Sequence, residues 1–267
     1  MAPRRRLDAE LVRRGLAADD RAARLLVDAG RVLVGGAIAR TAGRLVGPAE
    51  ALVVQGPPPP YVSRGGYKLA AALDVFGIDP GGLRAIDVGS STGGFTDCLL
   101  QRGAASVVAV DVGRHQLHER LRADPRVEVR EQTDVRAVDL AAIGGPAPLV
   151  VADLSFVALR RVAEALLALV AADGRLVVLV KPQFEAETAE ASRGRGVISD
   201  PVVWRRVLGE VRDTLVSHGA AMMGAMRSPI TGADGNVEFL VLVVPQGTST
   251  VDDAALDALV HLAKGEA

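Results

Sequence analysis

The sequence predicts an α/β fold: a mostly parallel sheet with helices on both faces, preceded by a small α+β module. In the region after the prolines at 57–60, short continuous apolar runs alternate with segments of helical periodicity. Such runs are typical of parallel strands buried on both faces of a sheet. The four prolines act as a stiff, extended spacer. We therefore expect a first domain over residues 1–57, a linker over 58–63 and a second domain over 64–267.

The composition is that of a globular protein with an aliphatic core. Of the 267 residues, 49% are hydrophobic and 24% are charged, which excludes a disordered chain. The single cysteine, Cys98, excludes an internal disulfide and a multi-cysteine zinc site, and we interpret it as a small core residue. The apolar stretches are shorter than the roughly 18 residues that span a bilayer, and the charged start is unlike a signal peptide. We expect a cytoplasmic protein with no membrane partner and no obligate protein partner.

The N-terminal segment combines two short helices with small strands. Leu7 and Leu11 begin an apolar helical pattern that Gly15 stops, and Asp19 or Asp20 is placed to cap a second helix. We expect helices near 7–15 and 19–30, and strands at 31–34, 37–38 and 52–54. Through Arg64 the chain has eleven basic and six acidic residues, an excess of +5 that predicts a module for binding polyanions.

The second domain reads as seven strands separated by helices. The expected strands are 85–88, 107–111, 127–129, 149–153, 176–180, 222–226 and 237–244. The expected helices are 95–101, 116–123, 159–172, 204–218 and 252–264. This alternation predicts a mostly parallel sheet.

A glycine-rich turn follows the first strand of this domain, and such a turn is where an open α/β sheet binds its ligand. Asp111 ends the next strand, 22 positions after Gly89, where a carboxylate can accept hydrogen bonds from ribose hydroxyls. The spacing G-x-x-x-G-G differs from the dinucleotide pattern and from a phosphate-binding loop, and is typical of a site for S-adenosylmethionine. The candidate cofactor residues are Gly89, Ser90, Ser91, Thr92, Gly93, Gly94, Phe95, Asp111 and Asp134.

Charged side chains stand at the ends of other strands. Asp153 and Lys181 each end an expected parallel strand, so both project at the ligand-binding edge. Glu238 begins the last strand, and an antiparallel strand would start at that same edge. A lysine at the end of a buried apolar strand needs a compensating partner. A further lysine, Lys68, follows Arg64-Gly65-Gly66 at the beginning of the second domain. The candidate catalytic residues are therefore Lys68, Asp153, Lys181 and Glu238.

These four residues resemble the Lys-Asp-Lys-Glu tetrad of ribose 2′-O-methyltransferases of the FtsJ type. The whole chain resembles the TlyA family of bacterial rRNA 2′-O-methyltransferases, historically labelled haemolysins. The matching stretches are RLD at 6–8 with Leu11, VSRGGYKL at 62–69, DVGSSTGGFT at 87–96, VADLSF at 151–156, VKPQFE at 180–185 and GNVE at 235–238.

The resemblance implies a Rossmann-like class I methyltransferase with a seven-stranded sheet, behind a small RNA-binding domain of the ribosomal-protein αL-motif type. It implies the four residues above as catalytic tetrad, S-adenosylmethionine as cofactor, and a cytidine ribose of ribosomal RNA, in 16S and possibly 23S, as substrate. It also implies an effect on capreomycin and viomycin sensitivity. The family linker usually carries Arg-x-Trp-Val, which is said to couple the two domains, whereas this chain has Pro59-Pro60-Tyr61-Val62 and lacks the arginine.

For the reaction, we expect Lys181 to act as the base or to organise the nucleophile, with Asp153 and Glu238 orienting the lysines. Phe156 is a candidate to stack on the target base, with a core or lid role as the alternative. The candidate RNA-binding residues are Arg4, Arg6, Arg14, Arg64 and Phe156.

Two other features of the sequence allow a second interpretation. His115 and His118, three apart on an expected helix, are interpreted as surface residues because two metal ligands without partners form no site. The loop 193–196 is either an RNA contact or a solvated loop.

Two other functions are possible interpretations of the sequence. One is a membrane-active cytolysin, for which no strongly basic amphipathic helix is present. The other is an RNA-binding assembly factor with an inactive body, which would not need a complete tetrad.

Overall fold

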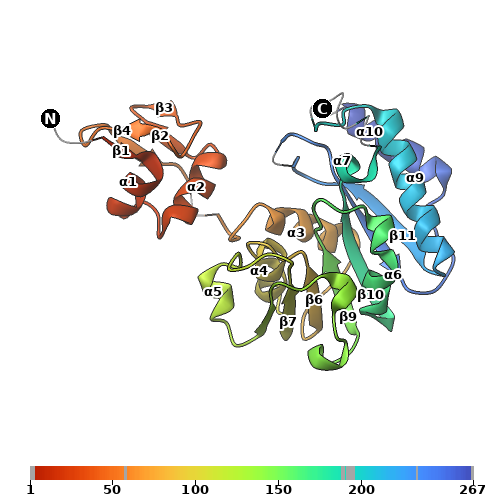
Figure 1. The fold of residues 1–267 in the computed structure, drawn as a ribbon. Coiled ribbons are helices and arrows are strands. Elements are labelled where there is room, and N and C mark those ends of the chain that lie inside the picture. The colour runs from red at the N-terminus through yellow and green to blue at the C-terminus, as the bar shows by residue number, and fades with distance from the viewer. Residues whose placement is uncertain (1–3, 57–58, 188–189, 191–195, 233, 266–267) are drawn as a thin grey trace. The chain divides into compact units, whose positions relative to one another are not determined.

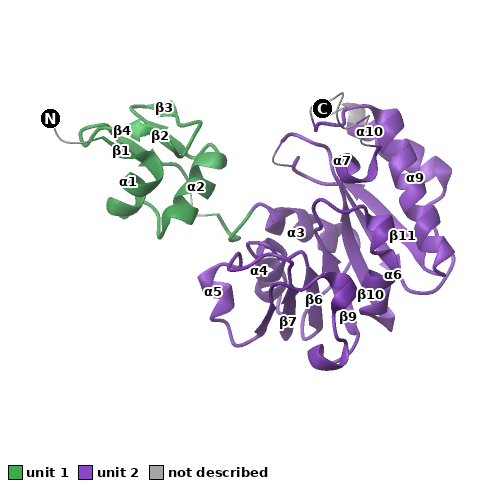
Figure 2. Cartoon of the chain, in the orientation of Figure 1, with its two compact units in different colours: residues 1–63 green, residues 64–267 purple. Residues whose placement is uncertain are grey.

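The computed structural model describes residues 4–56, 59–187, 190, 196–232 and 234–265. The chain forms two compact units, Met1–Ser63 and Arg64–Ala267, and each is described by itself (Figures 1 and 2).

The N-terminal unit packs two helices against two small sheets. Asp19 caps the second helix, since its side chain accepts a hydrogen bond from the amide of Ala22 at 2.7 Å. Leu7, Leu11 and Leu26 lie in the core of this unit. The helices are α1 (Leu7–Arg13) and α2 (Asp20–Asp28). The strands are β1 (Arg5–Arg6), β2 (Val32–Val34), β3 (Ala37–Ile38), β4 (Leu45–Val46) and β5 (Leu52–Val54), in the orders β1-β4 and β3-β2-β5.

The larger unit contains a seven-stranded sheet in the order β11-β12-β10-β9-β6-β7-β8 (Figure 1). The five strands from β10 to β8 are parallel, and β12 is antiparallel to both β10 and β11. The mostly parallel sheet is therefore confirmed, and β12 has the antiparallel direction that the placement of Glu238 at the ligand-binding edge required. The bounds are β6 (Arg84–Val88), β7 (Ser106–Val110), β8 (Val127–Arg130), β9 (Ala147–Ala152), β10 (Val170–Val180), β11 (Ala221–Arg227) and β12 (Phe239–Val244).

Helices cover the sheet. One face packs against α6, α9 and α10, where Leu166, Trp204 and Leu256 join Ile86 and Val178 in a single apolar core. The helices α3 and α4 pack on each other elsewhere in this unit. The helices are α3 (Gly65–Val75), α4 (Gly94–Gln101), α5 (Glu119–Arg122), α6 (Ala163–Ala168), α7 (Pro182–Glu185), α9 (Pro201–Ser217) and α10 (Asp253–Gly265).

Two expected helices are shorter than predicted. The segment 159–172 splits into a 3-10 turn η3 (Leu159–Arg161), α6 and the beginning of β10, because Val170 pairs with Ala147 of β9. The helix expected over 116–123 shrinks to α5. Its first residues instead form a loop whose amides donate to the carboxylate of Glu131, at 2.8 Å from His115 and 3.0 Å from Gln116.

The structure does not describe every residue of two expected segments. Outside the described residues lie Pro57 and Pro58 of the proline spacer, and Arg193, Gly194 and Arg195 of the expected basic loop. Among the helices that are described, none has the length and apolarity needed to cross a bilayer.

Candidate active site

The glycine turn between β6 and α4 forms one wall of a pocket. Gly89 adopts φ +80°, and a β-carbon there would overlap the backbone carbonyl of Asp153, so the position requires glycine. The amide of Ser91, itself at φ +45°, donates to Oδ2 of Asp111 at 2.7 Å. The turn is thus fixed against the ends of both neighbouring strands, β9 and β7.

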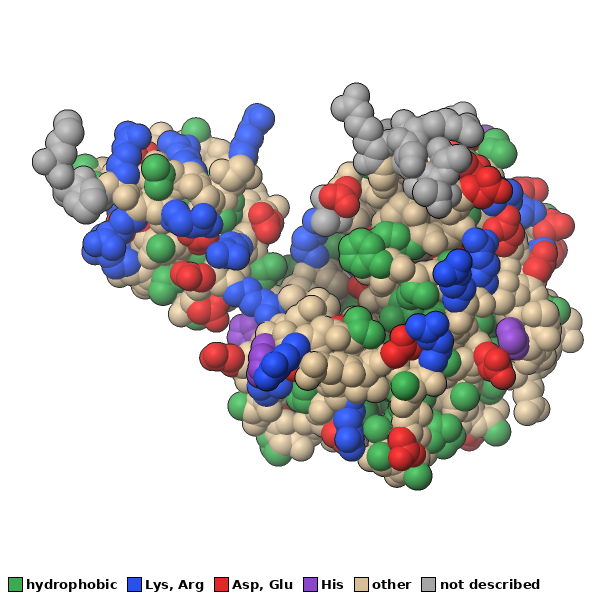
Figure 3. Space-filling view, in the orientation of Figure 1, with side chains coloured by type: hydrophobic (Ala, Val, Ile, Leu, Met, Phe, Trp, Pro, Cys, Tyr) green, Lys and Arg blue, Asp and Glu red, His purple; other side chains and the backbone are tan. Residues whose placement is uncertain are grey.

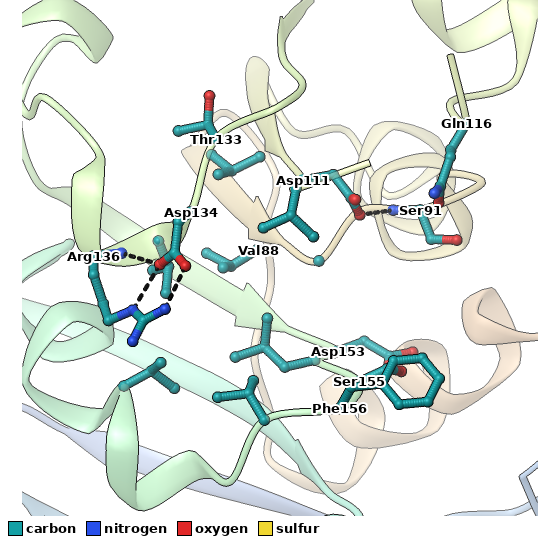
Figure 4. A pocket seen from close by; sticks show the side chains of 17 residues that line it. Val88, Ser91, Asp111, Gln116, Thr133, Asp134, Arg136, Asp153, Ser155 and Phe156 are labelled. Carbon is teal, nitrogen blue, oxygen red and sulfur yellow. Dashed lines mark hydrogen bonds and ion pairs between the residues drawn. The ribbon is translucent and has the colours of Figure 1, made fainter. Parts of the chain in front are cut away.

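The pocket itself has a volume of about 420 Å³ and lies at the carboxyl ends of the parallel strands (Figure 4). Six of the predicted site residues line it: Gly89, Ser91, Asp111, Asp134, Asp153 and Phe156. The sequence reasoning missed its other lining residues, among them Gln116, Thr133, Arg136 and Ser155. Most of them stand in loops that follow the strands. Inspection of the residues just beyond the end of each of the five parallel strands would have found Thr133 and Ser155.

The other predicted cofactor residues support the turn rather than line the pocket. Ser90 and Phe95 are buried, and Gly93 adopts φ +96°, where a β-carbon would overlap the side chains of Leu117 and Leu121. Thr92 and Gly94 are likewise absent from the pocket wall among the described residues. These positions therefore shape the turn and do not line the pocket.

Asp87, at the end of β6, is a buried acid that the sequence reasoning did not single out. Its Oδ2 accepts a hydrogen bond from the hydroxyl of Thr96 at 2.6 Å, while Oδ1 has no partner among the described residues. Burial raises the pKa of Asp87 to about 7, and the charges of Asp153 and Asp111 act in the same direction. A carboxyl group with a pKa near 7 is only partly ionised at neutral pH, which limits the negative charge beside the pocket.

The two carboxylates predicted to bind a cofactor are held differently. Asp111 accepts amide hydrogen bonds from Ser91 and, at 2.6 Å, from Gly113, so its carboxylate is fixed but keeps accepting capacity. Asp134 is bound by the guanidinium of Arg136, with Nε at 2.9 Å and Nη2 at 2.6 Å, and this contact lowers the pKa of Asp134 to about 2 (Figure 4).

Lys181 and Asp153 form an ion pair at the pocket. Nζ of Lys181 lies 2.6 Å from Oδ1 of Asp153 and donates a hydrogen bond to the hydroxyl of Ser155 at 2.9 Å. Both charged side chains are largely shielded, with 11% and 23% of their surface exposed. Ion pairs at such depth interact strongly, because little water screens them.

Lys68 and Glu238 form the second pair. Nζ of Lys68, on α3, contacts Oε2 of Glu238, and both side chains are nearly inaccessible, with 9% and 3% exposed. Glu238 directly precedes β12. The antiparallel register pairs Val180 with Phe239, so Lys181 and Glu238 occupy the next facing positions. The structure thus brings the four predicted residues to one edge of the sheet, although only three could be placed there by topology.

Phe156 is the most exposed large apolar side chain that the structure describes, at 91%. Its φ is +63°, a conformation that costs energy for a residue with a β-carbon. Its ring lies 5.2 Å from that of Phe184, which in turn lies 5.7 Å from Nζ of Lys181. An exposed aromatic ring is therefore held at the pocket wall beside the Lys181 pair.

The predicted RNA-binding arginines differ in their surroundings. Arg4 and Arg6 are exposed, although Arg6 also pairs with the buried Asp8 at 2.7 Å. Arg14 is mostly covered and donates to the carbonyl oxygens of Glu50 and Pro48, which gives it a structural role. Arg64, in the larger unit, donates to the carbonyl oxygen of Thr231 at 2.6 Å.

The N-terminal unit presents a basic surface. Figure 3 shows basic side chains, all of them arginines in this unit, distributed over its visible face. Its exposed arginines include Arg4, Arg5, Arg6, Arg13, Arg24, Arg40 and Arg44.

The two units match two known families. Residues 61–244 match the FtsJ-like methyltransferase family and residues 5–52 match the S4 domain. The chain is 44% identical to the 16S/23S rRNA (cytidine-2′-O)-methyltransferase TlyA of Mycobacterium tuberculosis, over 100% of this chain and 99% of that protein. It is also 31% identical to the 23S rRNA (cytidine-2′-O)-methyltransferase TlyA of Campylobacter jejuni, over 67% of this chain and 69% of that protein.

Solved structures agree with these matches. A protein named as a hemolysin from Streptococcus thermophilus has 35% identity and a TM-score of 0.78, covering 100% of this chain and 98% of that chain. A second, from Lactococcus lactis, has 37% identity and a TM-score of 0.71, covering 76% of this chain and 98% of that chain.

Proposed function

The chain belongs to the TlyA family of FtsJ-like methyltransferases, and from this we propose that it methylates the ribose 2′-hydroxyl of a cytidine in ribosomal RNA. The methyl donor in this proposal is S-adenosylmethionine, and the reaction takes place in the cytoplasm on rRNA or a ribosomal subunit. The observation that carries the proposal is the Lys181–Asp153 ion pair, which stands at the wall of a nucleoside-sized pocket.

The pocket suits S-adenosylmethionine in size and in chemistry. Its volume of about 420 Å³ falls within the usual range for small-molecule sites. The carboxylate of Asp111 can accept from ribose hydroxyls, and the apolar walls formed by Val88, Val110 and Val112 suit an adenine ring. Asp153 also lines the pocket, and its carboxylate favours a cationic donor although Lys181 already pairs with its Oδ1 at 2.6 Å.

The reaction is a displacement in which the chain supplies positioning and proton transfer. When bound, S-adenosylmethionine provides an electrophilic methyl group. We place Lys181 facing the attacking 2′-hydroxyl, where its side chain, as the free amine, takes up the hydroxyl proton, and Asp153 orients that amine and balances the charge of the ammonium that forms. Lys68 and Glu238 fix the charge and the geometry beside it.

Phe156 is assigned to the target base. A ribose reaches a pocket at the sheet edge only when its nucleotide leaves the RNA stack, and extruded bases are commonly held on aromatic faces. The exposed ring of Phe156, backed by Phe184, offers such a face next to Lys181.

The test of this function is transfer of tritiated methyl from S-adenosylmethionine to purified ribosomal subunits. We expect label in the RNA of at least one subunit, and we expect digestion to nucleosides to yield 2′-O-methylcytidine. Label on a base, or none on either subunit, would contradict the proposal. Leakage of dye from liposomes at the same protein concentration would instead support the cytolysin alternative.

We assign the first RNA contact to the N-terminal unit, through Arg4 and Arg6 and their exposed neighbours. Phosphate contacts release counterions, so we expect RNA affinity to fall steeply with salt, by roughly tenfold or more between 50 and 200 mM. Fluorescence anisotropy with labelled rRNA measures this slope. An Arg4→Ala, Arg6→Ala double variant should flatten it, and an unchanged slope in that variant would remove these two residues from the interface.

A further inference from the structure

Glu185 is a buried acid that the proposed mechanism does not use. It ends α7, four residues after Lys181, and only 4% of its surface is exposed. Burial raises the pKa of Glu185 to about 7, against the effects of its bond to the Leu159 amide and of the Arg160 charge. Burying a carboxyl group is costly unless its oxygens find partners. The contact of Glu185 therefore calls for an explanation.

That contact is with the first amide of η3. Oε1 of Glu185 accepts a hydrogen bond from the backbone N–H of Leu159 at 2.6 Å, and the bond is buried. Amides in the first turn of a helix lack partners within the helix. The residue before this turn, Ala158, has no side-chain atom that could cap it. Glu185 supplies the missing acceptor from a distant part of the sequence.

This bond fixes one end of the loop 153–158, which runs from the end of β9 to η3. Lys181 holds the other end, through Asp153 at 2.6 Å and Ser155 at 2.9 Å. Between the two ends, the ring of Phe184 packs on that of Phe156. The short segment 181–185 therefore contacts the loop at its start, its middle and its end.

The loop needs such support because its conformation is strained. Phe156 has φ +63° and an almost fully exposed side chain, so burial of its own ring does not offset the backbone strain. Residues in sparsely populated conformations persist only where their surroundings hold them. The anchors at both ends of the loop provide this restraint.

We propose that Glu185 is a positioning residue for methyl transfer: by accepting from the Leu159 amide it holds the loop 153–158, and thereby Asp153, Ser155 and Phe156, in the reactive arrangement. The proposal rests on the proposed function. It also makes a claim about the loop itself that can be measured without RNA.

The experiment compares Glu185→Ala, which removes the acceptor, with Glu185→Gln, which keeps a carbonyl oxygen at the same distance. Hydrogen exchange followed by mass spectrometry reports on the peptide 154–160. We expect exchange of the Leu159 amide to rise at least tenfold in E185A and less than threefold in E185Q. Unchanged exchange in E185A would overturn the proposal.

Methyl transfer supplies the second measurement. We expect kcat to fall at least tenfold in E185A and to return to within threefold of the wild type in E185Q. Leu256→Ala, a core change on α10 far along the chain, controls for general loss of stability and should leave kcat unchanged below its unfolding temperature. A wild-type kcat in E185A would overturn the proposal.

The comparison stays decisive if E185A does not fold and if the wild-type protein shows no methyl transfer. If E185A does not fold, Glu185→Asp replaces it, because the shorter side chain withdraws the carboxylate from Leu159, and the same exchange and activity changes are expected. If the wild-type protein methylates neither subunit, the proposed function fails, while the exchange comparison still decides whether Glu185 holds the loop.

Discussion

Replacing Lys181 with alanine is expected to lower the rate of methyl transfer by about three orders of magnitude, within the range for loss of a group that transfers a proton. The 2′-hydroxyl of ribose is a weak acid, and Lys181 is the proposed acceptor of its proton. Asp153 would remain, but the side-chain nitrogen that it orients would be gone. Single-turnover transfer of tritiated methyl, at saturating RNA and donor, measures the change.

The chain offers a matched control for this variant. It contains three lysines, and Lys264, on α10, is the one that the proposed mechanism does not use, so Lys264→Ala should keep the wild-type rate. Lys181 is absent from the described lining of the pocket, so the affinity of K181A for S-adenosylhomocysteine should stay within about threefold of the wild type in calorimetry. A near-normal rate in K181A would remove this residue from the chemistry.

Replacing Lys68 with methionine is expected to lower the free energy of unfolding of the larger unit by about 3 kcal/mol, because it leaves the buried Glu238 without a counter-charge. The change should also abolish methyl transfer. Urea unfolding followed by the fluorescence of Trp204 measures the stability, since this single tryptophan is buried in the larger unit. The activity assay is the one used for Lys181.

A double variant separates the two effects. Lys68→Met with Glu238→Met removes both charges, and we expect most of the lost stability to return while activity stays absent. Glu128→Gln breaks an exposed ion pair with Arg130 and should cost less than about 1 kcal/mol. If the double variant is no more stable than K68M, an unpaired charge is not the reason for the loss.

Strand ends were the part of the site that could be predicted from sequence. Asp111, Asp153 and Lys181 all directly follow or end apolar runs, and in a parallel sheet such residues must meet at one edge. The glycine turn could be predicted for a related reason: positive φ and close backbone approach leave glycine as the residue that fits at position 89.

Contacts between distant segments could not be predicted in this way. The helix α3 carries Lys68 to Glu238, 170 positions away, and no periodicity encodes that pairing. The carboxylate of Glu131 similarly draws three backbone amides into a loop where helical periodicity had favoured a longer helix. In the N-terminal unit, β1 and β4 are two residues each, too short for any alternation to show. The equally short β3 could be expected because it follows the Gly35-Gly36 turn.

The position of β12 between β10 and β11 bears on how the protein is made. Synthesis proceeds from the N-terminus, so β10 is exposed along one edge until the segment 239–244 has left the ribosome and inserted beside it. Glu238 arrives with that insertion. A chain that ends before residue 238 therefore lacks both the strand that covers this edge of β10 and the acidic partner of Lys68, so it cannot hold the four charged residues of the proposed mechanism.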